Sequence, residues 1–118
     1  MGAKQDTGAR GEDQAAQFLI DAGYRILDRN WRISDGEIDI VAEDRDGLII
    51  FVEVKTRRNQ AFGHPLEAIT HAKAGRLRRL ALAWLISHKL WSAQFRIDAI
   101  AIIGSGSSYS LDHRKAIL

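Results

Sequence analysis

The chain contains no cysteine, a single proline and no long apolar run. Without cysteine it can form neither a disulfide framework nor a thiolate zinc site. A membrane-spanning helix needs roughly 20 consecutive apolar residues, which this sequence does not offer. Residues 1–10 also lack the hydrophobic segment of a signal peptide. We therefore expect a soluble, cytoplasmic protein that does not contact a membrane.

The length and composition suit one folding unit. The chain has 118 residues, of which 46% are apolar, and this is enough for one hydrophobic core and too little for two. We predict a single domain over residues 1–118, with residues 1–7 flexible.

The charged residues are distributed unevenly. The net charge is only +2, yet twelve of the 15 acidic residues lie at or before Glu53. Residues 68–97 contain no acid and carry Lys73, Arg76, Arg78, Arg79, Lys89 and Arg96. This asymmetry predicts a basic surface for a polyanion beside an acidic pocket.

Hydrophobic spacing predicts a mixture of helices and strands. A helix is expected over residues 8–22, and Pro65 suits the first turn of a long helix that runs to His88. Strands are predicted over 24–33, where the arginines favour a sheet edge, and over 37–43, 48–55 and 95–103. The state of the tail, residues 109–118, stays open.

Four charged side chains interrupt two otherwise apolar strands: Glu37, Asp39, Glu53 and Lys55. Burying a charge costs several kcal/mol unless it is paired or bound to a metal. Charges placed between isoleucine, valine and phenylalanine therefore need a compensating partner, and a divalent cation is the natural candidate.

The turn between these strands sets which side chains meet. A three-residue loop, 45–47, suits a type I turn followed by a left-handed glycine. Asp39 then lies opposite Glu53, and Glu37 lies opposite Lys55. All four charged side chains should share one face, and the opposite face should hold Ile38, Ile40, Val52 and Val54. A two-residue loop would instead place Asp39 and Glu53 on opposite faces.

Two carboxylates on neighbouring strands suit Mg²⁺ or Mn²⁺, which prefer oxygen ligands. Such an ion, held by Asp39 and Glu53, could activate water and stabilise a leaving oxygen, with Lys55 positioning the water. The pattern therefore indicates hydrolysis of a phosphodiester. Glu12 lies on the apolar side of the first helix, where a role in metal binding and a simple interaction with the helix dipole are equally favoured.

Several basic residues are candidates for binding nucleic acid. Arg57 and Arg58, just past the strand that carries Lys55, could hold a scissile phosphate, and Arg10 could do so from the first helix. Lys73 and Arg76 belong to the basic stretch, for which a solvated helix face is the equally weighted alternative.

Other polar and aromatic residues are assigned structural roles. The four histidines show no metal-binding spacing. Asp98, in a late strand with apolar neighbours, is expected to be hydrogen-bonded within the fold. Trp31 is the aromatic residue that we would test for contact with nucleic acid.

Several motifs together give a family resemblance: Gly11-Glu12, residues 23–27, Asn30-Trp31-Arg32, residues 36–41 and residues 51–57. Over nearly the whole chain they resemble the YraN-like family of small bacterial proteins. That family is similar to the restriction-endonuclease-like superfamily, which includes Holliday junction resolvases and uses an Asp followed by a Glu-x-Lys triplet.

The resemblance implies an α/β endonuclease-like domain with a central mixed sheet flanked by helices. It implies metal ligation by Asp39 and Glu53, a catalytic or water-positioning Lys55 and an accessory carboxylate at Glu12. The tail departs from the family pattern after His113. Glu37 is not part of the superfamily pattern, and it could pair with Lys55.

The resulting hypothesis is a Mg²⁺- or Mn²⁺-dependent nuclease that acts on duplex, branched or damaged DNA, with a homodimer as a further expectation. The main alternative is a nucleic-acid-binding module with the same fold and no turnover. A structural or partner-binding protein is a third hypothesis, and it would bind DNA weakly with little dependence on salt.

Overall fold

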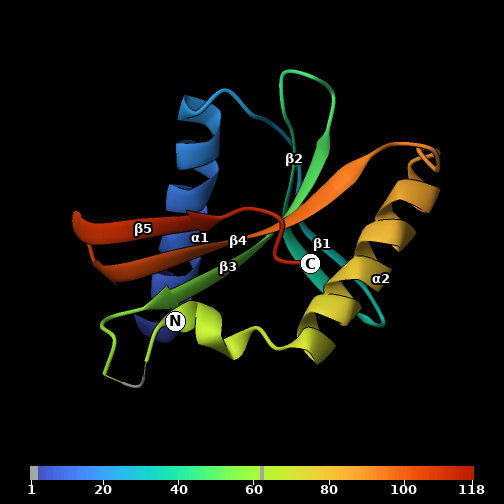
Figure 1. Ribbon diagram of the computed structural model, residues 1–118. Helices are drawn as coiled ribbons and strands as arrows, with labels where there is room; N and C mark the ends of the chain where they lie inside the picture. The colour runs from blue at the N-terminus through green and yellow to red at the C-terminus, as the bar shows by residue number, and fades with distance from the viewer. Residues whose placement is uncertain (1–2, 62) are drawn as a thin grey trace.

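The computed structural model describes residues 3–61 and 63–118 (Figure 1). Its elements, in chain order, are α1 (Ala3–Asp21), β1 (Arg25–Ile33), β2 (Gly36–Glu43), β3 (Ile49–Arg57), a short 3-10 helix η1 (Pro65–Ala68), α2 (His71–Ser87), β4 (Phe95–Ser105) and β5 (Ser108–Arg114). None of the helices in the described ranges is long and apolar enough to cross a membrane.

The strands form one mixed sheet in the order β1-β2-β3-β4-β5. Neighbouring strands are antiparallel except β3 and β4, which run parallel because η1 and α2 carry the chain back along the sheet. Helices α1 and α2 lie on opposite sides of the sheet (Figure 1). The predicted α/β fold is confirmed, as is the position of β1 at a sheet edge.

Each side of the sheet has its own apolar core. The α1-side core contains Ala15, Ala16, Leu19, Ile40, Ala42, Ile50, Val52, Ile100 and Ile102. The α2-side core contains Ile38, Val41, Ile49, Phe51, Leu80, Ala81, Trp84, Leu85 and Ile97. Strand β3 contributes to both cores, so it is covered on both faces and its side chains are held in place by packing.

The hairpin between β2 and β3 has the predicted turn. Gly47 adopts a left-handed φ of 87°, and the amide of Asp44 donates to the carbonyl of Leu48. The Asp44 carboxylate accepts the backbone N–H groups of Asp46 and Leu48, both at 2.9 Å. In this register Ile40 pairs with Val52, and its continuation sets Asp39 opposite Glu53.

The predicted division of side chains between the two faces is wrong at Ile38. Ile40, Val52 and Val54 pack on the α1 side as expected, but Ile38 belongs to the α2-side core. Regular alternation is therefore broken between Ile38 and Ile40. On the neighbouring strand β1, Asn30 lies between the pairs Arg29–Ile40 and Trp31–Ile38 and has a left-handed φ of 54°.

The predicted long helix from Pro65 to His88 is wrong as well. The chain forms η1, leaves the helical conformation at Ile69, and restarts as α2 at His71. The break arises because Thr70 is extended and its hydroxyl caps the new helix by accepting the N–H of Lys73. At the other end of the chain, α1 begins at Ala3 rather than at residue 8, and the expected flexibility of residues 1–7 stays a prediction.

The open question of the tail is settled by β5, which pairs with β4. The fully buried Asp98 on β4 accepts hydrogen bonds from Arg96, from Nε2 of His113 on β5 at 2.8 Å, and from the amide of Ala116 in the tail at 3.0 Å. Asp98 therefore has the structural role predicted for it, and it fastens the C-terminal tail to the sheet.

Candidate active site

Asp39 lies where β2 and β3 separate. Their regular pairing reaches Ile40 and Val52, and the Asp39 side chain then accepts the backbone N–H of Val54 at 2.8 Å. A side chain on β2 thus accepts the hydrogen bond of a backbone amide on β3. This hydrogen bond fixes the carboxylate beside Glu53, its neighbour across the hairpin.

Three other carboxylates act on the ionisation of Asp39. Burial, followed by repulsion from Glu53, raises the pKa of Asp39 to about 8 against the hydrogen bond from Val54, and Glu12 and Glu37 raise it further. The raised pKa favours the protonated form of Asp39 at neutral pH. A divalent cation would relieve the same repulsion.

Glu12 reaches this site because α1 packs closely on β3. Gly11 is buried, and a Cβ atom there would clash with the hydroxyl oxygen of Thr56. The absence of a side chain at Gly11 lets the helix approach the strand. The Glu12 side chain is only 14% exposed and pairs with Arg29 at 3.3 Å. Glu12 is thus a third carboxylate at the rim, restrained by a cation from β1.

Arg29 is a residue that the sequence argument missed at this site. It also pairs with Asp13 at 2.7 Å, and the hydrogen bond to Asp13 is the main reason that its pKa is raised. The sequence indicates only that an arginine lies in an edge strand. Its contact with α1 depends on tertiary packing, for which the sequence offers no local signal.

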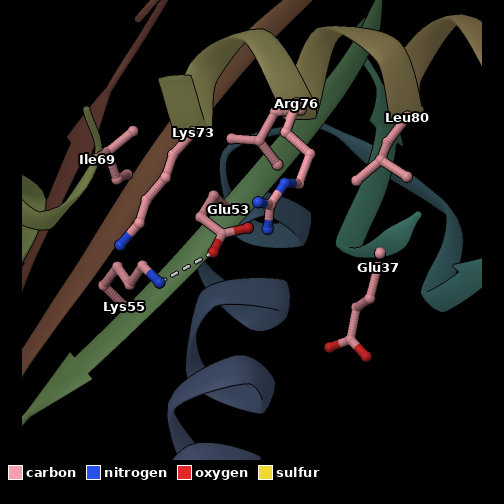
Figure 2. Close-up of a pocket in the computed structure, with 9 residues that line it drawn as sticks. Glu37, Glu53, Lys55, Ile69, Lys73, Arg76 and Leu80 are labelled. Carbon is pink, nitrogen blue, oxygen red and sulfur yellow. Dashed lines mark ion pairs between the residues drawn. The ribbon is translucent and has the colours of Figure 1, made fainter. Parts of the chain in front are cut away.

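Lys55 and Glu53 form a half-buried ion pair, with Nζ and Oε1 3.2 Å apart (Figure 2). The two side chains are 24% and 18% exposed. Glu37 does not pair with Lys55, contrary to the alternative raised from the sequence, and instead binds Arg32 on β1. Lys55 therefore has Glu53 as its carboxylate partner among the described residues.

A cleft of about 180 Å³ opens between this pair and α2. Figure 2 shows Lys73 and Arg76 extending from α2 over Glu53 and Lys55. Within residues 3–61 and 63–118, neither Lys73 nor Arg76 forms an ion pair. The structure thus brings these two predicted nucleic-acid-binding residues together with the Glu-x-Lys motif.

Three other predicted nucleic-acid-binding residues stay outside this cleft. Arg10 and Arg58 are exposed, and Arg57 donates to the carbonyl of Thr56 and lines a separate pocket with His64. Trp31 is half-buried against the α2-side core, which gives it a packing role. Nucleic-acid contact by Arg10, Arg57 and Arg58 stays a prediction.

The donor chemistry fits a hard divalent ion. Asp39 and Glu53 offer carboxylate oxygens that repel each other, and Mg²⁺ is commonly bound by one or two carboxylates plus water. No group of three or more His, Asp or Glu side chains in the described part of the chain could hold a metal ion. Glu12 is paired with Arg29 in this structure.

Comparison with known proteins places the chain in a family. The model of the uncharacterised protein family UPF0102 matches residues 11–102. The chain belongs to this family. UPF0102 is the YraN-like group that the sequence motifs resemble, so that prediction is confirmed.

Two UPF0102 relatives match this protein over nearly their whole length. A UPF0102 protein of Arthrobacter sp. (strain FB24) is 52% identical over 118 residues, which are 99% of each chain. One from Paenarthrobacter aurescens (strain TC1) is 50% identical, over 99% of this chain and 97% of its own.

Two solved structures show weaker likeness to this UPF0102 protein. A chain of an EndoMS–dsDNA2 complex has 17% identity and a TM-score of 0.42, and the match covers 74% of this chain but only 34% of that one. Pyrococcus furiosus SfsA in complex with Ca²⁺ has 16% identity and a TM-score of 0.37, with coverages of 91% and 63%. Likenesses at this level carry no functional argument.

Proposed function

We propose that this UPF0102 protein is a metal-dependent nuclease that hydrolyses DNA phosphodiesters. The observation that carries the proposal is the placement of Glu53 and Lys55 in a cleft that also contains the cations Lys73 and Arg76, with Asp39 next to Glu53 and bonded to the amide of Val54. The same order, Asp followed by Glu-x-Lys on neighbouring strands, is the pattern of the restriction-endonuclease-like superfamily that the sequence resembles.

Each residue has a role in this mechanism. Asp39 and Glu53 would hold Mg²⁺ or Mn²⁺, with Glu12 as an accessory carboxylate. The ion would lower the pKa of a bound water and stabilise the leaving oxygen. Lys73 and Arg76 bind DNA phosphates at the α2 side of the cleft. Lys55, held by Glu53, orients the water and neutralises charge that develops on the phosphate.

Cleavage assays test the proposal. Duplex, single-stranded, flap and four-way-junction DNAs are incubated with the protein and Mg²⁺ or Mn²⁺. We expect metal-dependent cutting that falls by about 100-fold or more in Glu53→Gln and in Lys55→Ala, because each removes a group that acts in the transition state.

Glu43→Gln is the matched control for these variants. Glu43 lies on the same hairpin but pairs with Arg25 at the far end of β2, so its loss should leave cutting unchanged. Cutting that persists in Glu53→Gln would contradict the proposal, as would cutting that survives chelation of the metal.

A DNA-binding module without turnover is the second candidate. It is favoured by Lys73 and Arg76, which form no ion pair among the described residues and suit a polyanion whether or not cutting follows. DNA binding with no cutting in either metal, unchanged by Glu53→Gln, would select this candidate over the nuclease.

A further inference from the structure

We propose that the cleft beside α2 receives one unpaired nucleotide, so that the substrate is a single-stranded or locally unpaired DNA segment rather than an intact duplex. This inference rests on the proposed nuclease function. It adds the class of DNA that the site accepts.

The composition of the cleft is the first argument. One side carries the charged groups of Glu53 and Lys55, and the α2 side adds the apolar side chains of Ile69 and Leu77 (Figure 2 labels Ile69). Both apolar residues are half-buried where they line the cleft. A site for the phosphate backbone alone has no use for an apolar wall, whereas a base that has left the stack is commonly held by apolar side chains.

The size of the cleft is the second argument. Its volume of about 180 Å³ is smaller than typical small-molecule sites, which span roughly 300–1,000 Å³. It can admit a single flat ring and is too small for a base pair. In an intact duplex both faces of each base are covered by its neighbours, so only an unstacked base can lie against Leu77.

The positions of the cations are the third argument. Lys73 and Arg76 are three residues apart on α2, so they share one face of the helix and both line the cleft. Lys55 lies across from them on β3. Positive charge therefore borders the apolar wall on the α2 side, where it suits a phosphate next to the bound base, while across the cleft Lys55 is paired with Glu53 and Glu37 also lines the wall.

Binding measurements with EDTA test the inference separately from cutting. The probes are a 20-nucleotide DNA strand and the duplex of the same sequence, each carrying one 2-aminopurine, followed by anisotropy and by 2-aminopurine fluorescence. We expect the single strand to bind about tenfold more tightly. Phosphate charge alone would favour the duplex, whose charge density is higher, so this preference requires contact with bases.

Leu77→Gln removes part of the apolar wall, and Leu82→Gln is its matched control. Leu82 is 40% exposed on α2 and does not line the cleft. We expect Leu77→Gln to weaken single-strand binding by about fivefold and to leave duplex binding unchanged, and Leu82→Gln to change neither. If Leu77→Gln does not give a cooperative thermal melt, Ile69→Gln provides the same test from outside the helix.

The outcomes separate the two proposals. Equal affinity for strand and duplex, or equal loss of both in Leu77→Gln, overturns this inference. If such a protein still cuts duplex DNA with Mg²⁺, the nuclease proposal stands alone. A preference for the single strand that depends on Leu77, with no cutting in any metal, upholds the unpaired nucleotide and overturns the nuclease.

Discussion

At the scale of single residues, the raised pKa of Asp39 links the stability of the fold to pH. A carboxylate with a pKa raised to about 8 costs folding free energy when it ionises. Between the ordinary value of 3.8 and about 8, the folded chain keeps a proton that the unfolded chain releases. Stability therefore falls as pH rises through this window, unless a cation occupies the site.

This linkage gives a prediction for Asp39→Asn. In EDTA at pH 7 to 8, the variant should be more stable than the wild type by on the order of 1–3 kcal/mol, because asparagine keeps an acceptor for Val54 without the charge. The difference should disappear near pH 4. Thermal melts from pH 4 to 9 measure this difference in stability, with Asp35→Asn as the control because Asp35 is exposed.

With saturating Mg²⁺, the wild type should become more stable than Asp39→Asn, since it gains metal-binding energy that the variant lacks. Wild type and variant that respond identically to pH and to Mg²⁺ would show that Asp39 is not the coupled, metal-binding carboxylate inferred here.

At the scale of elements, Asp98 on β4 is a second buried carboxylate, and it holds the C-terminal tail against the sheet. Its pKa is shifted in the opposite direction to that of Asp39. Burial alone would raise the pKa of Asp98, but the hydrogen bonds from His113, Arg96 and Ala116 lower it overall. The folded state therefore favours the ionised form. The resulting stability is present above the ordinary value of 3.8 and is lost as pH falls through the lower folded value.

We predict that Asp98→Asn lowers the free energy of unfolding by about 2–4 kcal/mol at pH 7, because Arg96 and His113 lose a buried charged acceptor. The deficit should narrow at a pH below 4. Urea titrations measure it, and Asp21→Asn is the control, since Asp21 is exposed and accepts only from Gln17 among the described side chains. A variant as stable as wild type would exclude this role.

The elements also show which expectations the sequence can support. The register of the β2–β3 hairpin follows from a loop of three residues that ends in Gly47, which is a local property. The sequence pattern places Ile38 in the wrong core because the regular alternation of side chains along β2 breaks near Asp39, whose side chain bonds to β3. The helix break at Thr70 has a local capping signal that competed with an otherwise continuous apolar stripe.

In the candidate site too, features set by local sequence were predictable and features set by tertiary packing were not. Asp39, Glu53 and Lys55 were predictable because they are close in sequence on one hairpin. The pairing of Glu12 with Arg29 was not, because it depends on how α1 packs against the sheet. The placement of Lys73 and Arg76 over the motif depends likewise on the path of the crossover through η1.

At the scale of the whole molecule, the cleft cations should govern the salt dependence of DNA binding. We predict that Lys73→Ala and Arg76→Ala each reduce the slope of log K against log salt by about 1, because each removes one phosphate contact. Titrations between low and physiological salt measure the slope. Arg79→Ala, exposed on the same helix but outside the cleft, should leave it unchanged. Slopes that do not differ from wild type would place the DNA elsewhere.

The edge strand β1 bears on how copies of this chain could assemble. Its arginines bind acidic residues of their own molecule: Arg25 binds Glu43, Arg29 binds Glu12 and Asp13, and Arg32 binds Glu37. Together with the left-handed Asn30, these charges make the edge a poor template for another strand. The expected homodimer would then not extend the sheet at β1, and its copies would meet through helices, loops or the other edge strand, β5.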